Sequence, residues 1–333
     1  MIVIDGSIGE GGGQIIRTSL ALSCFTGTPV KIINIRAKRK QPGLRPQHFS
    51  VVNALAELFN AEVKGNFVGS KELYFSPEKF SGIDDYEVNV GTAGSVTLIL
   101  QALLLALHEH NLRLTLLGGT EVRWSPTIDY FDNVIRPAFE SFGFRFDLRI
   151  LRRGYYPEGG GKVIVNLEGS VFSPFDFLEK DDSREVQGVS VCCSLPYSVA
   201  ERQAKAAEQL LRESGYELNI RYFVGDGNKG SSCTLWQGFV GADALGEKGK
   251  PAEEVGREAA VKFLEESQAV VDSHLADNLI PYMAMITSAT KESCSFATSK
   301  VSNHCHTNMI ISQKFFDNVE FEVVKGKVIS RVK

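Results

Sequence analysis

The stretch MIVIDGSIGEGGGQIIR, Met1 to Arg17, contains the pattern that the rest of the chain repeats. Its first four residues are apolar and predict a short strand, and the glycine cluster between residues 9 and 13 predicts a tight turn. Apolar residues then recur at helical spacing from Ile15 to Cys24, and Gly27 is a typical helix end. The segment therefore predicts a strand, a glycine turn and a helix over about residues 14–26.

The same order of elements recurs twice more along the chain. Residues 88–90 lead through a turn at 91–95 into a predicted helix that ends near residue 108. A third copy is predicted near the C-terminus, with helices at about 276–286 and 308–315 and strands at about 295–298 and 319–322. Each unit is of the βαβαββ type, so we expect an α+β fold in which three repeated units form one large domain.

Residues 186–269 follow a different pattern, which predicts a smaller βαββα-type block between loops rich in glycine and charge. We therefore expect a large catalytic domain formed by residues 1–185 and 270–333, with residues 186–269 as an inserted small domain.

The charge is unevenly distributed over the 333 residues, although the formal net charge is only -4 at pH 7. Residues 11–56 hold no Asp or Glu but seven Lys and Arg, which leaves 29 cations against 40 anions elsewhere. The composition, 43% hydrophobic and 23% charged, excludes a disordered chain, and the net charge argues against a generically basic nucleic-acid coat. A basic block in an acidic protein favours contact with a local polyanion, with a solvated basic edge as the plain alternative.

Cysteine usage and hydropathy point to an intracellular protein. The six cysteines form no CxxC pair, no signal peptide is recognisable at the start, and the longest apolar run is too short to span a bilayer. We expect a soluble, thiol-reduced, cytoplasmic protein without a membrane partner.

The glycine turn is the first candidate site. Glycines let a ligand approach the backbone closely, and a helix N-terminus offers free N–H groups suited to phosphate. Glu10 in the turn could hold a divalent metal, and Arg17 one turn into the helix could clamp a phosphate. An ordinary tight turn is the alternative.

The second candidate is the run from Arg36 to His48, in which five cations surround a Pro-Gly kink. Like charges held so closely repel one another unless an anion neutralises them. No aromatic residues are interleaved with the cations, so the pattern indicates phosphate contact and not base stacking.

The third candidate is the run SNHCHTN, Ser302 to Asn308. In an extended backbone His304 and His306 would face one side and Cys305 the other, which disfavours a closed zinc site. A structural histidine near a helix start and a nucleophilic or acid–base histidine are the two remaining interpretations.

Together these motifs resemble the RNA 3'-terminal phosphate cyclase family. The resemblance covers essentially the whole chain, including the inserted block. It rests on motifs in the expected order: residues 9–17, 35–48, Gly94-Ser95 before Gln101, Tyr156-Pro157-Glu158-Gly159-Gly160-Gly161, and His304 before Thr307-Asn308.

The resemblance implies an ATP-dependent ligase that acts in RNA processing. In that reaction a histidine attacks the α-phosphate of ATP to give a covalent AMP-histidine, and AMP then passes to an RNA 3'-phosphate. The neighbouring 2'-OH finally closes a 2',3'-cyclic phosphodiester and releases AMP. The implied partners are ATP and an RNA with a 3'-phosphate end, and the implied cofactor is a divalent metal, Mg or Mn.

The resemblance also implies roles for individual residues. By position the nucleophile is His304 and not His306, with Asp277 and Arg17 as further catalytic residues and Glu10 as the metal ligand. We expect Asp277 to orient the imidazole through its second ring nitrogen. Residues implied to line the ATP and RNA-phosphate pocket are Gln14, Arg36, Arg39, Gln47, His48, Gln101, Pro126 and His274. Some family members have a tyrosine that stacks on adenine at the position of His274.

Two other functions are compatible with parts of the pattern. One is a non-catalytic relative that acts as a ribosome-assembly scaffold, although such relatives lack the nucleophilic histidine. The other is an enolpyruvyl-transfer-like enzyme, which would need neither the basic loop nor His304. The sequence leaves the oligomeric state open, a homodimer being one option.

Overall fold

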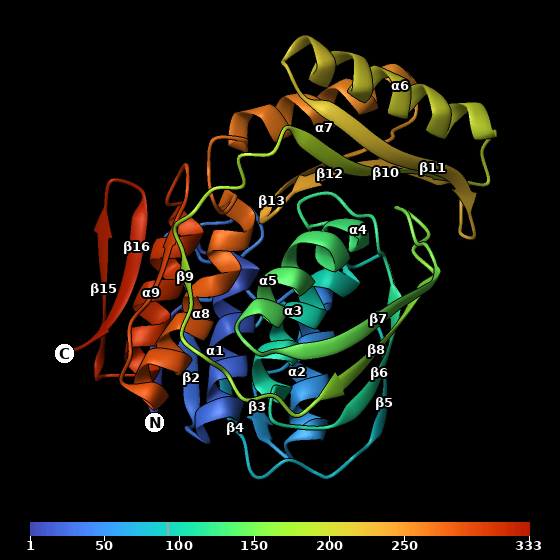
Figure 1. The fold of residues 1–333 in the computed structure, drawn as a ribbon. Coiled ribbons are helices and arrows are strands. Elements are labelled where there is room, and N and C mark those ends of the chain that lie inside the picture. Colours follow the sequence, from blue (N-terminus) through green and yellow to red (C-terminus); the bar gives the residue numbers. More distant parts are fainter. Residues whose placement is uncertain (92) are drawn as a thin grey trace.

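The computed structural model describes residues 1–91 and 93–333; Thr92, in the predicted turn at 91–95, lies outside the described residues. Figure 1 shows an α+β molecule in which helices lie between several sheets and a smaller lobe covers one end. Among the described residues, no helix is long and apolar enough to cross a membrane.

Three units of the larger body share one topology. In each four-stranded sheet the first two strands are parallel neighbours, and the fourth strand lies between the second and the third. The first unit comprises β1 (Ile2–Asp5), α1 (Gly13–Thr26), β2 (Val30–Ile33), α2 (Pro46–Leu58), β3 (Glu62–Lys64) and β4 (Leu73–Ser76). The second comprises β5 (Asp85–Asn89), α3 (Val96–Leu107), β6 (Leu112–Gly118), α4 (Ile128–Tyr130), a π-helical turn (Phe131–Ile135), α5 (Arg136–Ser141), β7 (Arg145–Arg152) and β8 (Gly161–Glu168).

The third unit is interrupted after its first strand. It consists of β9 (Asp176–Phe177), α8 (Ser273–Thr290), β14 (Cys294–Ala297), α9 (Asn303–Phe315), β15 (Val319–Val324) and β16 (Lys327–Val332). The strand β9 pairs in parallel with β14 although more than a hundred residues separate them. A two-residue strand carries no periodicity of its own, so the sequence did not predict it. The three predicted βαβαββ units are confirmed.

The smaller lobe comprises β10 (Glu185–Cys193), α6 (Tyr197–Glu213), β11 (Glu217–Gly225), β12 (Gly230–Gln237), β13 (Val240–Leu245) and α7 (Ala252–Glu266). It has one strand more than the predicted βαββα block, because the chain turns at Gly238, with φ of 54°, and β13 follows β12 as a further antiparallel strand. The lobe has its own sheet and its own apolar core. Both support our proposal that residues 186–269 form an inserted domain and that residues 1–185 and 270–333 form the catalytic one.

The main core lies where helices of all three units meet. Helices α1 and α3 pack together, as do α8 and α9, and α1 also packs against α9. Almost every side chain of α3 is buried, which its nearly uniform apolar sequence requires. Its one strongly polar residue, Gln101, faces a cavity instead.

Candidate active site

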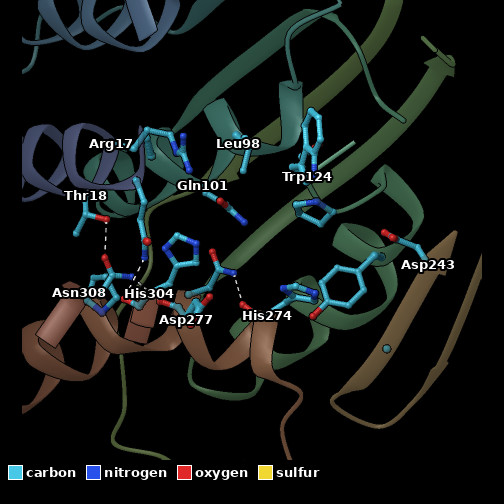
Figure 2. Close-up of a pocket in the computed structure, with 18 of the residues that line it drawn as sticks. Arg17, Thr18, Leu98, Gln101, Trp124, Asp243, His274, Asp277, His304 and Asn308 are labelled. Atoms are coloured by element: carbon cyan, nitrogen blue, oxygen red, sulfur yellow. Dashed lines mark hydrogen bonds between the residues drawn. The ribbon is translucent and has the colours of Figure 1, made fainter. Parts of the chain in front are cut away.

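A cavity of about 570 Å³ lies between the units and the inserted lobe (Figure 2). Its walls come from α1, α3, the loop before α4, α8 and α9, and from β13 and α7 of the lobe. Seven of the residues that sequence reasoning selected line it: Gln14, Arg17, Gln101, Pro126, His274, Asp277 and His304. Residues from positions 14 to 304 therefore meet in one place.

His304 lies in the first turn of α9. The Ser302 hydroxyl caps this helix by accepting hydrogen bonds of 3.0 Å from the backbone N–H groups of His304 and Cys305. The His304 side chain is 40% exposed, so a ligand can reach its ring. The segment is helical and not extended, since the cap starts α9 five residues before the predicted position. Consequently His306 is exposed while Cys305 is buried, and burial raises the pKa of the Cys305 thiol.

Asp277 of α8 is close to His304 but is bonded to other groups. One carboxylate oxygen accepts a hydrogen bond from the Ser302 hydroxyl, and burial raises the pKa of Asp277. Among the described residues the His304 ring makes no hydrogen bond to Asp277, contrary to our expectation. The carboxylate instead holds the start of α9, the helix that carries His304.

A chain of hydrogen bonds joins α8, α9 and α1 behind the histidine. The Asn308 amide donates to the Asp277 carbonyl at 2.7 Å, and the Thr18 hydroxyl donates to the Asn308 side-chain oxygen at 3.0 Å (Figure 2). The Gln14 amide donates to the His304 carbonyl at 3.3 Å, while its side-chain oxygen is buried without a partner among the described residues. These bonds fix the position of His304 relative to the glycine turn.

Cationic groups gather at the start of α1. Burial lowers the pKa of Arg17 to about 10, and no described carboxylate forms an ion pair with it. A Cβ added to Gly13 would lie 2.6 Å from His48 Nε2 and 3.2 Å from Arg17 Nη1, so this glycine permits both side chains to approach the turn. A half-buried guanidinium without a counter-ion among the described residues favours binding of an anion.

Glu10 connects the glycine turn with both His304 and the basic loop. Its Oε2 atom lies 3.9 Å from His304 Nε2 and 3.3 Å from the Arg39 guanidinium. Arg36 also lies in this loop, in a left-handed conformation with φ of 53°, and hydrogen-bonds the Gly43 carbonyl at 3.5 Å. Gln47 is exposed at the start of α2. None of Glu10, Arg36, Arg39, Gln47 and His48 lines the cavity. Contacts with the glycine turn or His304 are made by Glu10, Arg39 and His48.

The opposite end of the cavity is formed by the loop before α4, by α8 and by the inserted lobe. Pro126 and His274 both line it, and each is held by a backbone contact: Thr97 donates to the Pro126 carbonyl at 2.9 Å, and Asp272 accepts from the His274 N–H at 2.9 Å. Apolar and ring surfaces of this kind suit a planar base.

Sequence reasoning missed several lining residues, among them Trp124, Asp243 and Lys262. Asp243 and Lys262 belong to the inserted lobe and carry no local motif, so only the tertiary structure shows their position. Burial raises the pKa of Asp243, which accepts a hydrogen bond of 2.8 Å from the Thr127 N–H. Trp124 belongs to no periodic apolar pattern, so the residues next to it in the sequence do not predict that its side chain is exposed.

The donor set can be compared with the divalent metal that the resemblance implies. Across residues 1–91 and 93–333, no three His, Cys, Asp or Glu side chains are grouped as a protein-only metal site requires. A single carboxylate such as Glu10 nevertheless fits Mg²⁺, which is commonly held by one or two carboxylates together with water and substrate phosphates.

Comparisons with known proteins identify the family of this chain. The sequence model described as RNA 3'-terminal phosphate cyclase matches residues 8–323. Curated proteins with that same name are similar over nearly their full length: 43% identical in Methanosarcina acetivorans, with 97% of each chain covered, and 45% identical in Archaeoglobus fulgidus, with 96% of this chain and 97% of the relative covered. The relative from Pyrococcus furiosus is 44% identical, with 98% of this chain and 96% of its own covered. The chain belongs to the RNA 3'-terminal phosphate cyclase family.

Proposed function

We propose that this protein uses ATP to convert an RNA 3'-terminal phosphate into a 2',3'-cyclic phosphodiester, with His304 as the nucleophile. The observation that carries the proposal is the position of His304. Its half-exposed ring lies at a nucleotide-sized cavity, beside Glu10 and the glycine turn, with Arg17 on the adjacent wall.

In the first step, His304 Nε2 attacks the α-phosphorus of ATP. The new N–P bond forms as the bond to pyrophosphate breaks, and pyrophosphate leaves with the electron pair. In this proposal Arg17, which lines the cavity, and Arg39, which pairs with Glu10, offset the charge on the phosphate oxygens during this exchange. A divalent metal held by Glu10 would supply further charge neutralisation at the phosphates.

In the second step, an oxygen of the RNA 3'-phosphate attacks the AMP phosphorus and His304 leaves. The terminal 2'-OH then attacks the activated 3'-phosphorus, loses its proton, and AMP departs with the electrons of the broken P–O bond. Arg17, His48 and the basic loop supply donors for the RNA phosphate, and contact with phosphates and the 2'-OH requires little sequence specificity.

The inserted lobe contributes to the nucleotide pocket in this proposal. Gly241, Asp243 and Lys262 line the same cavity as His274 and Pro126, the residues that we propose contact adenine. Asp243 is fixed by Thr127, so the lobe and the second unit close this end of the pocket together.

The decisive test is incubation with ATP labelled at the α-phosphate. We expect acid-labile label on the wild-type protein and none on His304→Ala, whereas His306→Ala keeps the label because its side chain lies on the exposed face of α9. Pyrophosphate should be released in equal amount. A scaffold protein or an enolpyruvyl-transfer enzyme would take up no label with any divalent metal, and that result would overturn the proposal.

A further inference from the structure

An exposed tryptophan stands at the mouth of the cavity. Trp124 lines the cavity and is nevertheless 93% exposed, a large apolar surface left in water. Figure 2 shows its ring on the wall across from His304 and Asp277. Nothing in the catalytic steps above uses this side chain.

The backbone at Trp124 is in an unfavourable conformation. Its φ is 63°, in the left-handed region that is unfavourable for a bulky residue. A glycine would relieve that cost. This conformation directs the indole ring outward, where it packs against no other side chain in the described part of the protein. The ring therefore offers its surface to a bound ligand.

The loop that carries Trp124 is firmly anchored on both sides. Glu121 accepts a 2.6 Å hydrogen bond from the buried Arg153, and the Ser125 hydroxyl donates to the Val122 carbonyl at 2.8 Å. Arg123 forms an ion pair with Glu247 of the inserted lobe. The ring is therefore presented by a rigid turn, which reduces the entropy lost when a ligand stacks on it.

We propose that Trp124 is a stacking platform for the nucleobase at the 3' end of the RNA; this deepens the proposed function and rests on it. A nucleotide whose α-phosphate is at His304 occupies the enclosed part of the cavity, whereas an RNA chain must leave through the mouth. Unpaired terminal bases readily stack on aromatic rings, and every base offers such a face, so the contact adds affinity with little sequence preference. Stacking thus complements the phosphate contacts of the basic loop.

Tryptophan fluorescence tests the contact directly. The chain has two tryptophans, so Trp236→Phe leaves Trp124 as the sole indole reporter. We expect a single-stranded oligoribonucleotide with a 3'-phosphate to quench this emission with saturation, and ATP alone to leave it nearly unchanged. Equal quenching by ATP, with no further change on adding RNA, would show that the ring serves adenine and would overturn the proposal, as would no response to RNA.

Variants give an independent measurement. Replacing a stacked aromatic typically costs about 1–3 kcal/mol, so Trp124→Ala should weaken RNA binding about 5- to 150-fold, while Trp124→Phe recovers most of it. Tyr197→Ala is the matched control, because Tyr197 is an aromatic residue 52% exposed that does not line the cavity. Trp124→Gly should bind as weakly as Trp124→Ala but unfold at no lower temperature than wild type. Wild-type RNA affinity in Trp124→Ala or in Trp124→Gly contradicts the proposal.

The α-phosphate label keeps this proposal separate from the preceding one. If His304 takes up no label, the proposed chemistry fails whatever Trp124 does. If label forms normally in wild type but RNA neither quenches Trp124 nor binds more weakly to Trp124→Ala, the stacking proposal alone fails.

Discussion

At the scale of single residues, burial and neighbouring arginines keep the imidazole of His48 neutral, so that its ring N–H can act as a hydrogen-bond donor. Only 2% of the residue is exposed, and its Nδ1 accepts a 3.1 Å hydrogen bond from the Arg45 N–H. Burial, with the nearby charges of Arg17 and Arg36, lowers the pKa of His48 to about 3. With Nδ1 accepting, the ring proton lies on Nε2, which faces the glycine turn where we propose that phosphate binds.

This lowered pKa predicts a loss of stability in acid. The unfolded chain protonates His48 below about pH 6.5, whereas the folded chain does so only near pH 3, so stability falls as the pH drops below 6.5. His48 alone should account for about 2 kcal/mol at pH 5. Urea unfolding at pH 7.5 and pH 5 measures this difference, and His48→Gln should reduce it by that amount.

The matched control is the exposed His306→Gln, which should leave the pH dependence of the wild type intact. Part of the dependence will persist in His48→Gln, because burial also lowers the pKa of His108, to about 4. An unchanged pH dependence in His48→Gln would contradict the assignment.

At the scale of elements, the start of α9 positions the proposed nucleophile. Ser302 accepts the first N–H groups of the helix and donates to Asp277 of α8, so one hydroxyl connects the two helices. Ser302→Ala should therefore cost about 1–2 kcal/mol in the free energy of unfolding and slow label transfer to His304. Urea unfolding and the initial rate of labelling provide the two measurements.

Ser302→Thr is the matched control, since threonine retains the capping hydroxyl and should preserve both stability and labelling rate. If Ser302→Ala also preserves both, the cap does not position His304.

At the scale of the whole molecule, a buried ionic cluster of the second unit lies where that unit meets the inserted lobe. Arg153 binds Asp129 through two hydrogen bonds of 2.6 and 2.8 Å and Glu121 through one of 2.6 Å. Its backbone N–H also donates to the Asp226 carbonyl of the lobe at 2.8 Å. Burial raises the pKa of Glu121 to about 8, and Asp129 adds to that rise while the Arg153 charge opposes it.

Arg153→Met should lower the free energy of unfolding by about 3–5 kcal/mol, because the carboxyl groups of Asp129 and Glu121 would remain buried without the guanidinium that they bond. Chemical denaturation at pH 7 measures the loss. Arg149→Met is the control: its pair with Asp147 is exposed and should contribute less than about 1 kcal/mol. Equal effects of the two substitutions would show that the buried cluster contributes no more to stability than an exposed ion pair.

The α+β fold, the three repeated units and the family could be predicted from the sequence. Apolar periodicity and glycine turns depend on neighbouring residues, and the motifs around Glu10, Arg36 and His304 are contiguous in the chain. Because these patterns are local, the sequence missed the strand β9 and placed the start of α9 too late. The strand β9 was too short to show a period, and the start of α9 depended on a cap that only the folded helix reveals.

The sequence by itself determined which side chains could carry phosphate chemistry and in what order they occur. The tertiary structure decided which of them meet: seven line one cavity, five do not, and the inserted lobe supplies part of its wall. It also moved Asp277 from the His304 ring to the helix cap, and placed an exposed Trp124 at the mouth. These outcomes depend on contacts between residues far apart in the chain, which local patterns do not record.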